Sequence, residues 1–280
     1  MSRPFKSELV VEEKISDATL RAYHVGFDQN QFRLQPLVDI LVSVIPEFAF
    51  GYHETRSIEL TEMWGKLKDA ARLIYTTEKI KRRGEFGELV LHFLLRDFCK
   101  TIPLISKIYF KDTRNATVKG FDGIHVENNG SKKKLWLGES KIYADGKQGI
   151  ESLADDLKIH LTGDYLRSEF NLVSKKVPSS YPERDHWIAL MHEHQPLDKI
   201  FDSICMPMTC TYTSNLFKTH KSNTDKYIDD FKNECETLRK HFEGKKIKTD
   251  VEVILMLLPI ECKEKLITEL DSRLKHAQKI

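Results

Sequence analysis

The strongest constraint on this chain is the change of pattern at about residue 83. Apolar residues recur at spacings of three and four across residues 85–99, which predicts an amphipathic helix. Three short β-like segments follow at residues 105–110, 120–126 and 135–143, and a turn-forming Asn-Asn-Gly separates the last two. Beyond them the sequence predicts strands at 204–212 and 251–259 and helices at 148–160, 165–173, 225–242 and 262–276.

This order of elements predicts an α/β fold, with a mixed central sheet flanked by helices. Residues 1–80 have a different pattern, which predicts a short strand at residues 9–15 and helices at residues 31–44 and 59–75. The first of these helices is expected to stop at Ile45, because a proline disfavours the helical conformation in the residue before it. We therefore predict a mainly helical extension, residues 1–80, packed on a core of residues 81–280.

Composition excludes several classes of protein. The 280 residues are 40% hydrophobic and 31% charged, the balance of an ordinary globular protein. The longest apolar runs reach about ten residues, well short of the roughly twenty needed to span a bilayer. No apolar stretch of a secretory signal follows the N-terminus. The five cysteines are scattered singly and do not suggest a disulfide framework, so the cytoplasm is the expected location.

Positive charge is clustered rather than abundant. The formal net charge of +2 does not by itself indicate nucleic-acid binding. Basic residues nevertheless form groups at residues 79–83, 132–134, 175–176 and 245–248. Each group is suited to contacting phosphates, or is simply a solvated loop or helix end. The first two groups matter most, because they flank the candidate chemistry.

The candidate chemistry lies at the end of an apolar strand, in the sequence Glu139-Ser140-Lys141. Because side chains alternate along a strand, Glu139 and Lys141 face one side and Ser140 the other. The strand before it carries Asp122 between glycines, and antiparallel pairing would bring Asp122 beside Glu139. Two neighbouring carboxylates repel each other unless a cation lies between them. We therefore predict a site for a hard divalent ion, Mg²⁺ or Mn²⁺.

Glu-x-Lys alone is a weak signal, because the pattern also begins at Glu12, Glu243 and Glu261. Those three copies lie in polar surroundings at the ends of expected elements, and we interpret them as surface charge. Glu139 differs because it lies on an apolar strand with an acidic strand upstream.

The predicted helix at residues 85–99 adds a third acid. Glu85, Glu88 and His92 are spaced three and four residues apart. We favour Glu88 as the active-site acid, since the preceding Gly87 lets another element approach, and expect Glu85 to face solvent. His92 is expected to be half-buried or at the surface, with a supporting role in catalysis as the alternative. Gln148 would brace the site or lie on the surface.

Together these residues resemble the PD-(D/E)xK nucleases: a helix acid, a strand Asp, then Glu-x-Lys on the next strand. More narrowly, Gly-Glu-Phe-Gly-Glu at residues 84–88, Lys-Gly-Phe-Asp-Gly at 119–123 and Gly-Glu-Ser-Lys at 138–141 resemble the HamA subunit of Hachiman anti-phage defence systems. The motifs occupy a small part of the chain, although the resemblance covers most of it. One departure is Phe121, which stands where the superfamily pattern has proline.

The resemblance implies phosphodiester hydrolysis of DNA, a divalent metal and a helicase partner called HamB. The chemistry of such a site gives Asp122, Glu139 and the Ser140 carbonyl the role of holding Mg²⁺. Lys141 would orient the attacking water or neutralise charge developing on the phosphate, and Glu88 would support a second ion or order metal-bound water. The partner is expected to restrain the nuclease, and the N-terminal helices are the candidate docking surface.

Other readings are weaker. A zinc site would need four converging ligands, but Cys205 and Cys210, which follow His192 and His194, would point to opposite faces of a strand. No cysteine has a recognisable nucleophile context, and no Gly-rich phosphate-binding motif is present, so NTP hydrolysis would come from a partner. The remaining alternative is a catalytically inactive nuclease fold that binds nucleic acid or docks a partner. Against it, all four catalytic residue types are present.

Overall fold

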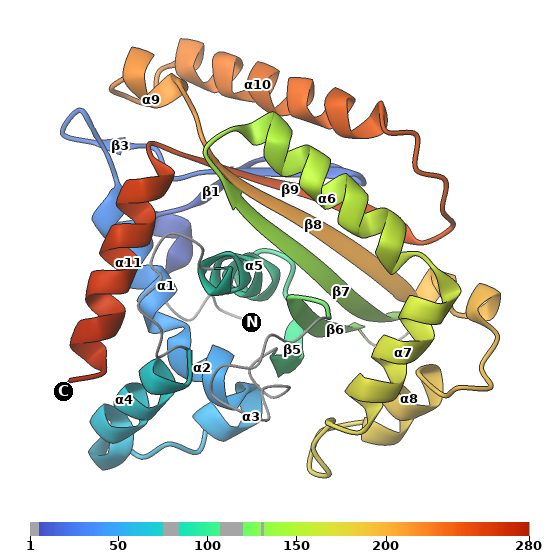
Figure 1. Cartoon of the computed structure of the whole chain (residues 1–280). Helices are drawn as coiled ribbons and strands as arrows, with labels where there is room; N and C mark the ends of the chain where they lie inside the picture. Colours follow the sequence, from blue (N-terminus) through green and yellow to red (C-terminus); the bar gives the residue numbers. More distant parts are fainter. Residues whose placement is uncertain (1–5, 75–83, 107–119, 130–131, 280) are drawn as a thin grey trace.

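The computed structural model describes residues 6–74, 84–106, 120–129 and 132–279. Its centre is a seven-stranded sheet in the order β1-β2-β9-β8-β7-β6-β5, with helices on both faces (Figure 1). This arrangement confirms the predicted α/β class with a mixed sheet. The strands are β1 Glu12–Ser16, β2 Leu20–His24, β5 Ile102–Ser106, β6 Gly123–Asn129, β7 Lys132–Tyr143, β8 Ile204–Thr213 and β9 Glu252–Ile260.

The sheet has an antiparallel half and a parallel half, which meet at β7. Strands β5, β6 and β7 pair antiparallel, whereas β7, β8, β9 and β2 pair parallel, with β1 antiparallel at the far edge. Parallel neighbours need long crossover connections, and helices provide them here. Between β7 and β8 lie α6 Gly146–His160, α7 Gly163–Ser174 and α8 Arg184–Leu190, and between β8 and β9 lie α9 Leu216–Thr219 and α10 Asp225–Glu243.

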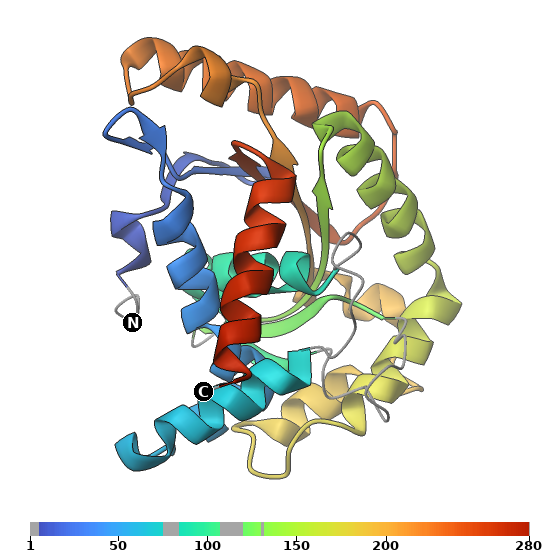
Figure 2. The ribbon, with the colours of Figure 1, turned by 60° about the vertical axis from the view of Figure 1, so that its left-hand side comes forward.

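The two faces of the sheet bury separate cores. Along β7, Trp136 packs with the helices on one face, while Leu135 and Leu137 pack with α6 and α7 on the other. This is the period-two alternation expected of a strand buried on both sides. Figure 2 shows α11 Lys263–Ala277 beside α1 Leu34–Ser43 on the first face. The remaining helices of this region are α2 Ile45–Phe50, α3 Tyr52–Thr55, α4 Met63–Ile74 and α5 Glu85–Asp97.

Helix α5 is buried almost all round, rather than along one stripe. It contacts β6 and β7 on one side and α1 and α2 on the other, so polar positions of the helix are also covered. His92 is only 2% exposed, and the prediction of a half-buried or surface histidine was wrong. The apolar periodicity identified the helix correctly, but could not show that a second layer of helices covers its outer face.

The N-terminal region contributes to the sheet as well as to the helical layer. Strands β1 and β2 continue the sheet beyond β9, so part of residues 1–80 belongs to the central sheet. The boundary at residue 80 stays a prediction. Helix α1 begins at Leu34, since Gln31 and Phe32 form the short strand β4 paired with β3 Phe27–Asp28. Pro46 lies in the first turn of α2, where its missing N–H costs no hydrogen bond.

The other predicted elements appear with small shifts at their ends. The strand predicted at 105–110 is β5, which begins earlier at Ile102, and residues 107–110 lie outside the described residues. Short elements such as β2 and α8 were not predicted, because five to seven residues give too little periodicity. Within the described ranges, no helix combines the length and apolarity needed to cross a membrane.

Candidate active site

The candidate site lies at a fork in the sheet. Pairing of β6 with β7 ends at Gly123 opposite Gly138, whereas β8 accompanies β7 onward to Tyr143. The Asp122 N–H donates to the Gly138 carbonyl at 2.9 Å, and this is where β6 begins. Glu139, the next residue of β7, therefore lies just past the β6 ladder. The fork brings an acid from one strand beside the Glu-x-Lys of the next.

Glycines permit the close packing behind this fork. A Cβ on Gly138 would lie 2.8 Å from Leu91 of α5, and a Cβ on Gly123 would lie 3.0 Å from the same side chain. The two glycines are paired across the strands, so Leu91 packs directly onto their backbones. Glycine is needed at these positions because α5 approaches the sheet closely.

The Asp122 carboxylate is held by hydrogen bonds from Ser140 of β7. Its Oδ2 accepts hydrogen bonds from the Ser140 N–H at 3.0 Å and from the Ser140 Oγ at 2.8 Å. Asp122 is only 6% exposed, so these bonds compensate part of the cost of burying it. The structure thus brings three of the predicted residues, Asp122, Glu139 and Ser140, into one cluster.

Lys141 joins this cluster through ion pairs. Its Nζ lies 2.7 Å from Glu139 Oε1, in agreement with the shared strand face, and 2.6 Å from Asp156 Oδ2. His160 Nε2 lies 4.0 Å from the other oxygen of Glu139. Asp156 and His160 are four residues apart on α6 and share one side of that helix. Sequence reasoning missed both. The only available signal was their spacing on the helix that follows Glu-x-Lys.

Next to the cluster, aromatic rings and a buried acid link α6, α7 and the segment before β6. The His160 ring stacks on Tyr165, with centroids 4.6 Å apart, and meets the edge of Phe121 at the same distance. Gly120 has φ of +148°, a backbone conformation that side chains rarely adopt, and a Cβ there would lie 2.8 Å from a Glu169 carboxylate oxygen. Glycine at position 120 thus lets the buried Glu169 come up to the chain beside the site.

The electrostatics of the cluster favour a cation. Burial, together with the nearby charge of Asp122, raises the pKa of Glu139 to about 8 in spite of the adjacent ammonium. Burial opposes the charge of Lys141, but Glu139 and Asp156 outweigh it and raise the pKa of Lys141 above its usual range. A divalent ion between Asp122 and Glu139 would relieve their repulsion. The donor set of two carboxylates and a backbone carbonyl therefore fits Mg²⁺ or Mn²⁺.

Glu88 lies beside this cluster without completing it. It is buried in the first turn of α5, one residue after Gly87, where a Cβ would lie 2.9 Å from the Ser140 Oγ. Among the described residues, no three or more His, Cys, Asp or Glu side chains are placed to hold one ion. Glu88 is therefore not a third carboxylate around Asp122 and Glu139 in this structure, and its predicted role stays a prediction.

The structure also places the remaining candidates. Gln148 is exposed, and its N–H donates to the Asp145 side chain that caps α6. Glu85 is half-buried at the start of α5. Cys205 and Cys210 pack into different cores on opposite faces of β8, as predicted in the argument against a zinc site. Lys132 of the second basic group and all of residues 79–83 lie outside the side chains that the structure describes.

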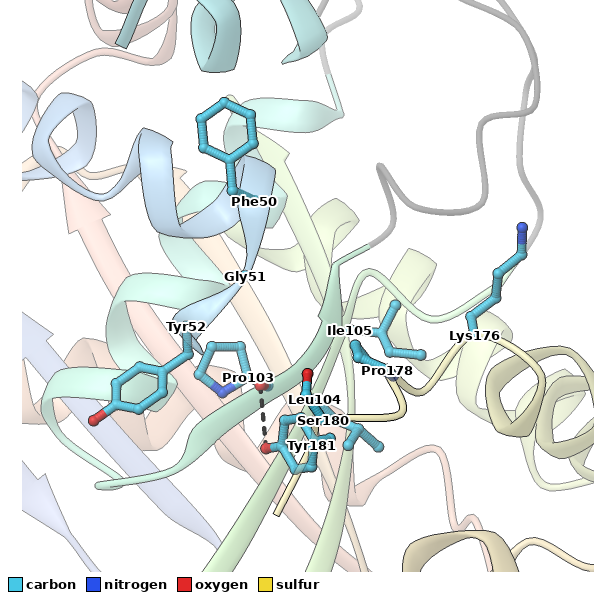
Figure 3. A pocket seen from close by; sticks show the side chains of 10 residues that line it. All are labelled: Phe50, Gly51, Tyr52, Pro103, Leu104, Ile105, Lys176, Pro178, Ser180 and Tyr181. Atoms are coloured by element: carbon cyan, nitrogen blue, oxygen red, sulfur yellow. Dashed lines mark hydrogen bonds between the residues drawn. The ribbon is translucent and has the colours of Figure 1, made fainter. Parts of the chain in front are cut away.

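A separate apolar hollow lies at the free edge of the sheet (Figure 3). It opens between α2, the edge strand β5 and the segment after α7, and the side chains drawn include Phe50, Lys176 and Tyr181. The Tyr181 hydroxyl donates to the Pro103 carbonyl at 3.3 Å. None of the residues that line this hollow belongs to the acidic cluster at the fork.

A mixed sheet whose two halves meet at a strand bearing Glu-x-Lys, with an Asp from the neighbouring strand, is the arrangement of a PD-(D/E)xK nuclease-like core. A family model described as HamA matches residues 3–274, and the chain belongs to the HamA family. Membership makes it a protein of the Hachiman type of anti-phage defence. No curated protein matches the chain.

Proposed function

We propose that the chain is a metal-dependent nuclease that hydrolyses phosphodiester bonds of DNA. The observation that carries the proposal is the fork cluster, in which buried Asp122 and Glu139 face each other's charge beside the Lys141 ammonium. Like charges brought together in this way are rare where packing is the only task, because their repulsion costs stability.

The proposed ligands of Mg²⁺ or Mn²⁺ are Asp122, Glu139 and the Ser140 carbonyl. When bound, the ion would polarise the scissile phosphate and lower the pKa of a coordinated water. The two hydrogen bonds from Ser140 fix the Asp122 carboxylate in advance. Lys141 would offer its ammonium to charge that develops on the phosphate, and Glu88 would support a second ion or order metal-bound water.

The charge balance of the site predicts strict dependence on the ion. Three carboxyl groups belong to the cluster, from Asp122, Glu139 and Asp156, and they are accompanied by one ammonium, from Lys141. Such a site repels a phosphate until a cation is bound. Activity is therefore expected with Mg²⁺ or Mn²⁺ and not in a chelator.

The test is cleavage of plasmid and of oligonucleotides by the purified chain, with each ion and with EDTA. Glu139→Ala is expected to abolish cleavage while thermal unfolding shows an intact fold. Glu261→Ala provides the matched control, because Glu261 belongs to another Glu-x-Lys and pairs with Lys265 at the surface. Wild-type cleavage by folded Glu139→Ala would refute the assignment. Binding of DNA without cleavage in any ion would favour the alternative, an inactive nuclease fold that binds nucleic acid or docks a partner.

We also propose that a HamB-like helicase controls the nuclease. Basic groups that contact phosphates carry no sequence information, so intrinsic selectivity should be low and free activity toxic. The sequence has no nucleotide-binding motif with which to regulate itself. The N-terminal helical region supports a docking role, because Leu60, Met63 and Trp64 near the start of α4 are 83%, 52% and 64% exposed.

Co-expression with the neighbouring helicase, followed by size-exclusion chromatography and cleavage assays with and without ATP, tests this control. Trp64→Lys is expected to separate the two proteins, whereas Leu172→Lys, at a surface leucine of α7, should leave them together. Independent elution of the wild-type proteins, or cleavage that the helicase never changes, would instead indicate a free-standing nuclease.

A further inference from the structure

Lys141 has a second carboxylate partner that the motif does not include. Asp156 on α6 lies 2.6 Å from the Lys141 ammonium, as close as Glu139 at 2.7 Å. The Lys141 side chain is 23% exposed and that of Asp156 is 31% exposed, so the pair is partly buried rather than free in solvent. Asp156 belongs to helix α6, which runs alongside β7 and β8 (Figure 1).

The neighbouring residue shows that this placement is specific. Asp155 has the same side chain one position earlier on α6, but it is 73% exposed and pairs with Lys158 within the same helix. Asp156 instead shares its side of the helix with His160, which approaches Glu139. One helix therefore approaches Glu139 through His160 and Lys141 through Asp156.

The two partners of Lys141 differ in what happens when an ion binds. Glu139 is a proposed metal ligand, so the ion would compete with Lys141 for its oxygens. Asp156 comes from a different element and would keep its contact with the ammonium. A lysine has a flexible four-carbon stem, and it needs such an anchor to present its charge at one place.

We propose that Asp156 is a positioning residue that holds the Lys141 ammonium at the scissile phosphate once the ion has taken Glu139. The inference rests on the proposed nuclease function. It assigns Asp156 no contact with the substrate: its effect passes through Lys141.

The expected signature is a loss of turnover with little loss of binding. Lys141 would act on charge that develops in the transition state, so misplacing it should lower kcat more than it raises KM. Residues that orient the immediate groups of a metal site typically contribute 10- to 100-fold, and Asp156→Asn is expected to lower kcat by about that factor. Asp156→Glu should recover part of the loss, because a carboxylate is restored.

The experiment compares cleavage by Asp156→Asn, Asp156→Glu and the matched control Asp155→Asn, each also in a Lys141→Ala background. Asp155→Asn should behave as wild type. In the Lys141→Ala background, Asp156→Asn should have no further effect on the residual rate. Full activity of Asp156→Asn, or an equal loss with and without Lys141, would overturn the proposal.

Thermal unfolding of the same variants separates this inference from the function on which it rests. Asp156→Asn and Lys141→Ala should give non-additive shifts of Tm, because they remove the two ends of one ion pair. Additive shifts would show that the pair does not form and would overturn the inference, whatever the activity. Absence of cleavage by the wild-type chain in both ions would instead refute the nuclease proposal, while non-additive shifts would still confirm the pair.

Discussion

Two polar clusters lie on opposite faces of the sheet, and their charges are arranged differently. The fork cluster gathers Glu139, Lys141 and Asp156 on the α6 face and includes Asp122 at the end of β6. The second cluster, here called the histidine cluster, joins α2, α5, β6 and the residue before β5 on the other face. Its members are Glu47, His92, Arg96, Thr101 and His125.

The histidine cluster is held together by ion pairs and hydrogen bonds. Glu47 Oε1 lies 2.9 Å from Arg96 Nε and 3.3 Å from His92 Nε2. His92 in turn meets His125 at 3.2 Å, and Thr101 meets the other ring nitrogen of His125 at 2.8 Å. Burial, with the nearby His92 and Arg96, lowers the pKa of His125 well below its usual range and keeps it neutral. The Arg96 guanidinium thus pairs with Glu47 and, at 4.0 Å, with Asp97, and hydrogen bonds link the two rings and Thr101.

The way in which charges are paired distinguishes a structural polar cluster from a functional one. A buried network of paired charges and hydrogen bonds holds its elements in one arrangement, and the loss of one member is destabilising. The fork cluster instead places carboxylates where they repel each other, so it costs stability and suits a ligand of opposite charge. Variants of the first should therefore act on stability, and variants of the second on activity and ion binding.

The largest effect is expected in the histidine cluster. Glu47→Ala removes the nearer of the two carboxylates that pair with the buried guanidinium of Arg96, and breaking a buried ion pair typically costs about 3–5 kcal/mol. Urea unfolding should show this loss, while the cleavage rate per folded molecule stays near wild type. Glu59→Ala, at an exposed residue before α4, is the control. Stability equal to wild type would contradict the view that this cluster is structural.

The next largest effect concerns the fork. Lys141→Ala should lower kcat by about 10²–10³, the typical cost of losing one group that stabilises developing charge. Folding should be retained, because Lys141 is partly exposed and not a core residue. Lys263→Ala, in another Glu-x-Lys, should cleave as wild type. A loss of cleavage that merely tracks a loss of folded protein would remove the distinction between the clusters.

A smaller effect should appear in the pH dependence of stability. The pKa of Glu139 in the folded chain, about 8, lies above its ordinary value of 4.5. Below pH 4.5 Glu139 is protonated in both the folded and the unfolded chain, so the raised pKa does not affect stability. As pH rises toward 8, Glu139 ionises first in the unfolded chain, and the free energy of unfolding therefore falls. Without metal, Glu139→Gln should be more stable than wild type by about 1–3 kcal/mol at pH 8, and equal near about pH 4.

Urea unfolding in EDTA across this pH range measures the difference. A wild-type chain that is as stable as Glu139→Gln at pH 8 would show that the two carboxylates do not strain the fold.

The smallest effect is on ion affinity. Asp122→Asn keeps most of the shape of the side chain but removes one of the two proposed carboxylate ligands. Calorimetric titration should show binding of Mn²⁺ weakened by about tenfold or more. Asp155→Asn should bind the ion as wild type does. Equal affinity in Asp122→Asn would place the ion, if one binds, elsewhere in the molecule.

The sequence by itself determined those features that depend on local spacing. Alternation along one strand placed Glu139 and Lys141 together, and apolar periodicity identified α5, α6, α10 and α11 to within a few residues. The resemblance of three short motifs also indicated the HamA family, which the family match confirms. The roles of Glu88, Asp122, Glu139 and Lys141 remain predictions, although three of these residues now share one cluster.

Only the tertiary structure decided which side of α6 faces β7, and hence that Asp156 rather than Asp155 meets Lys141. It likewise decided that His92 is buried against His125, 33 residues later, and that β2 lies beside β9 at the other end of the chain. The physical reason is the same in each case. Periodicity shows that a helix or strand has an apolar face, but the packing of distant elements selects the surface that this face covers.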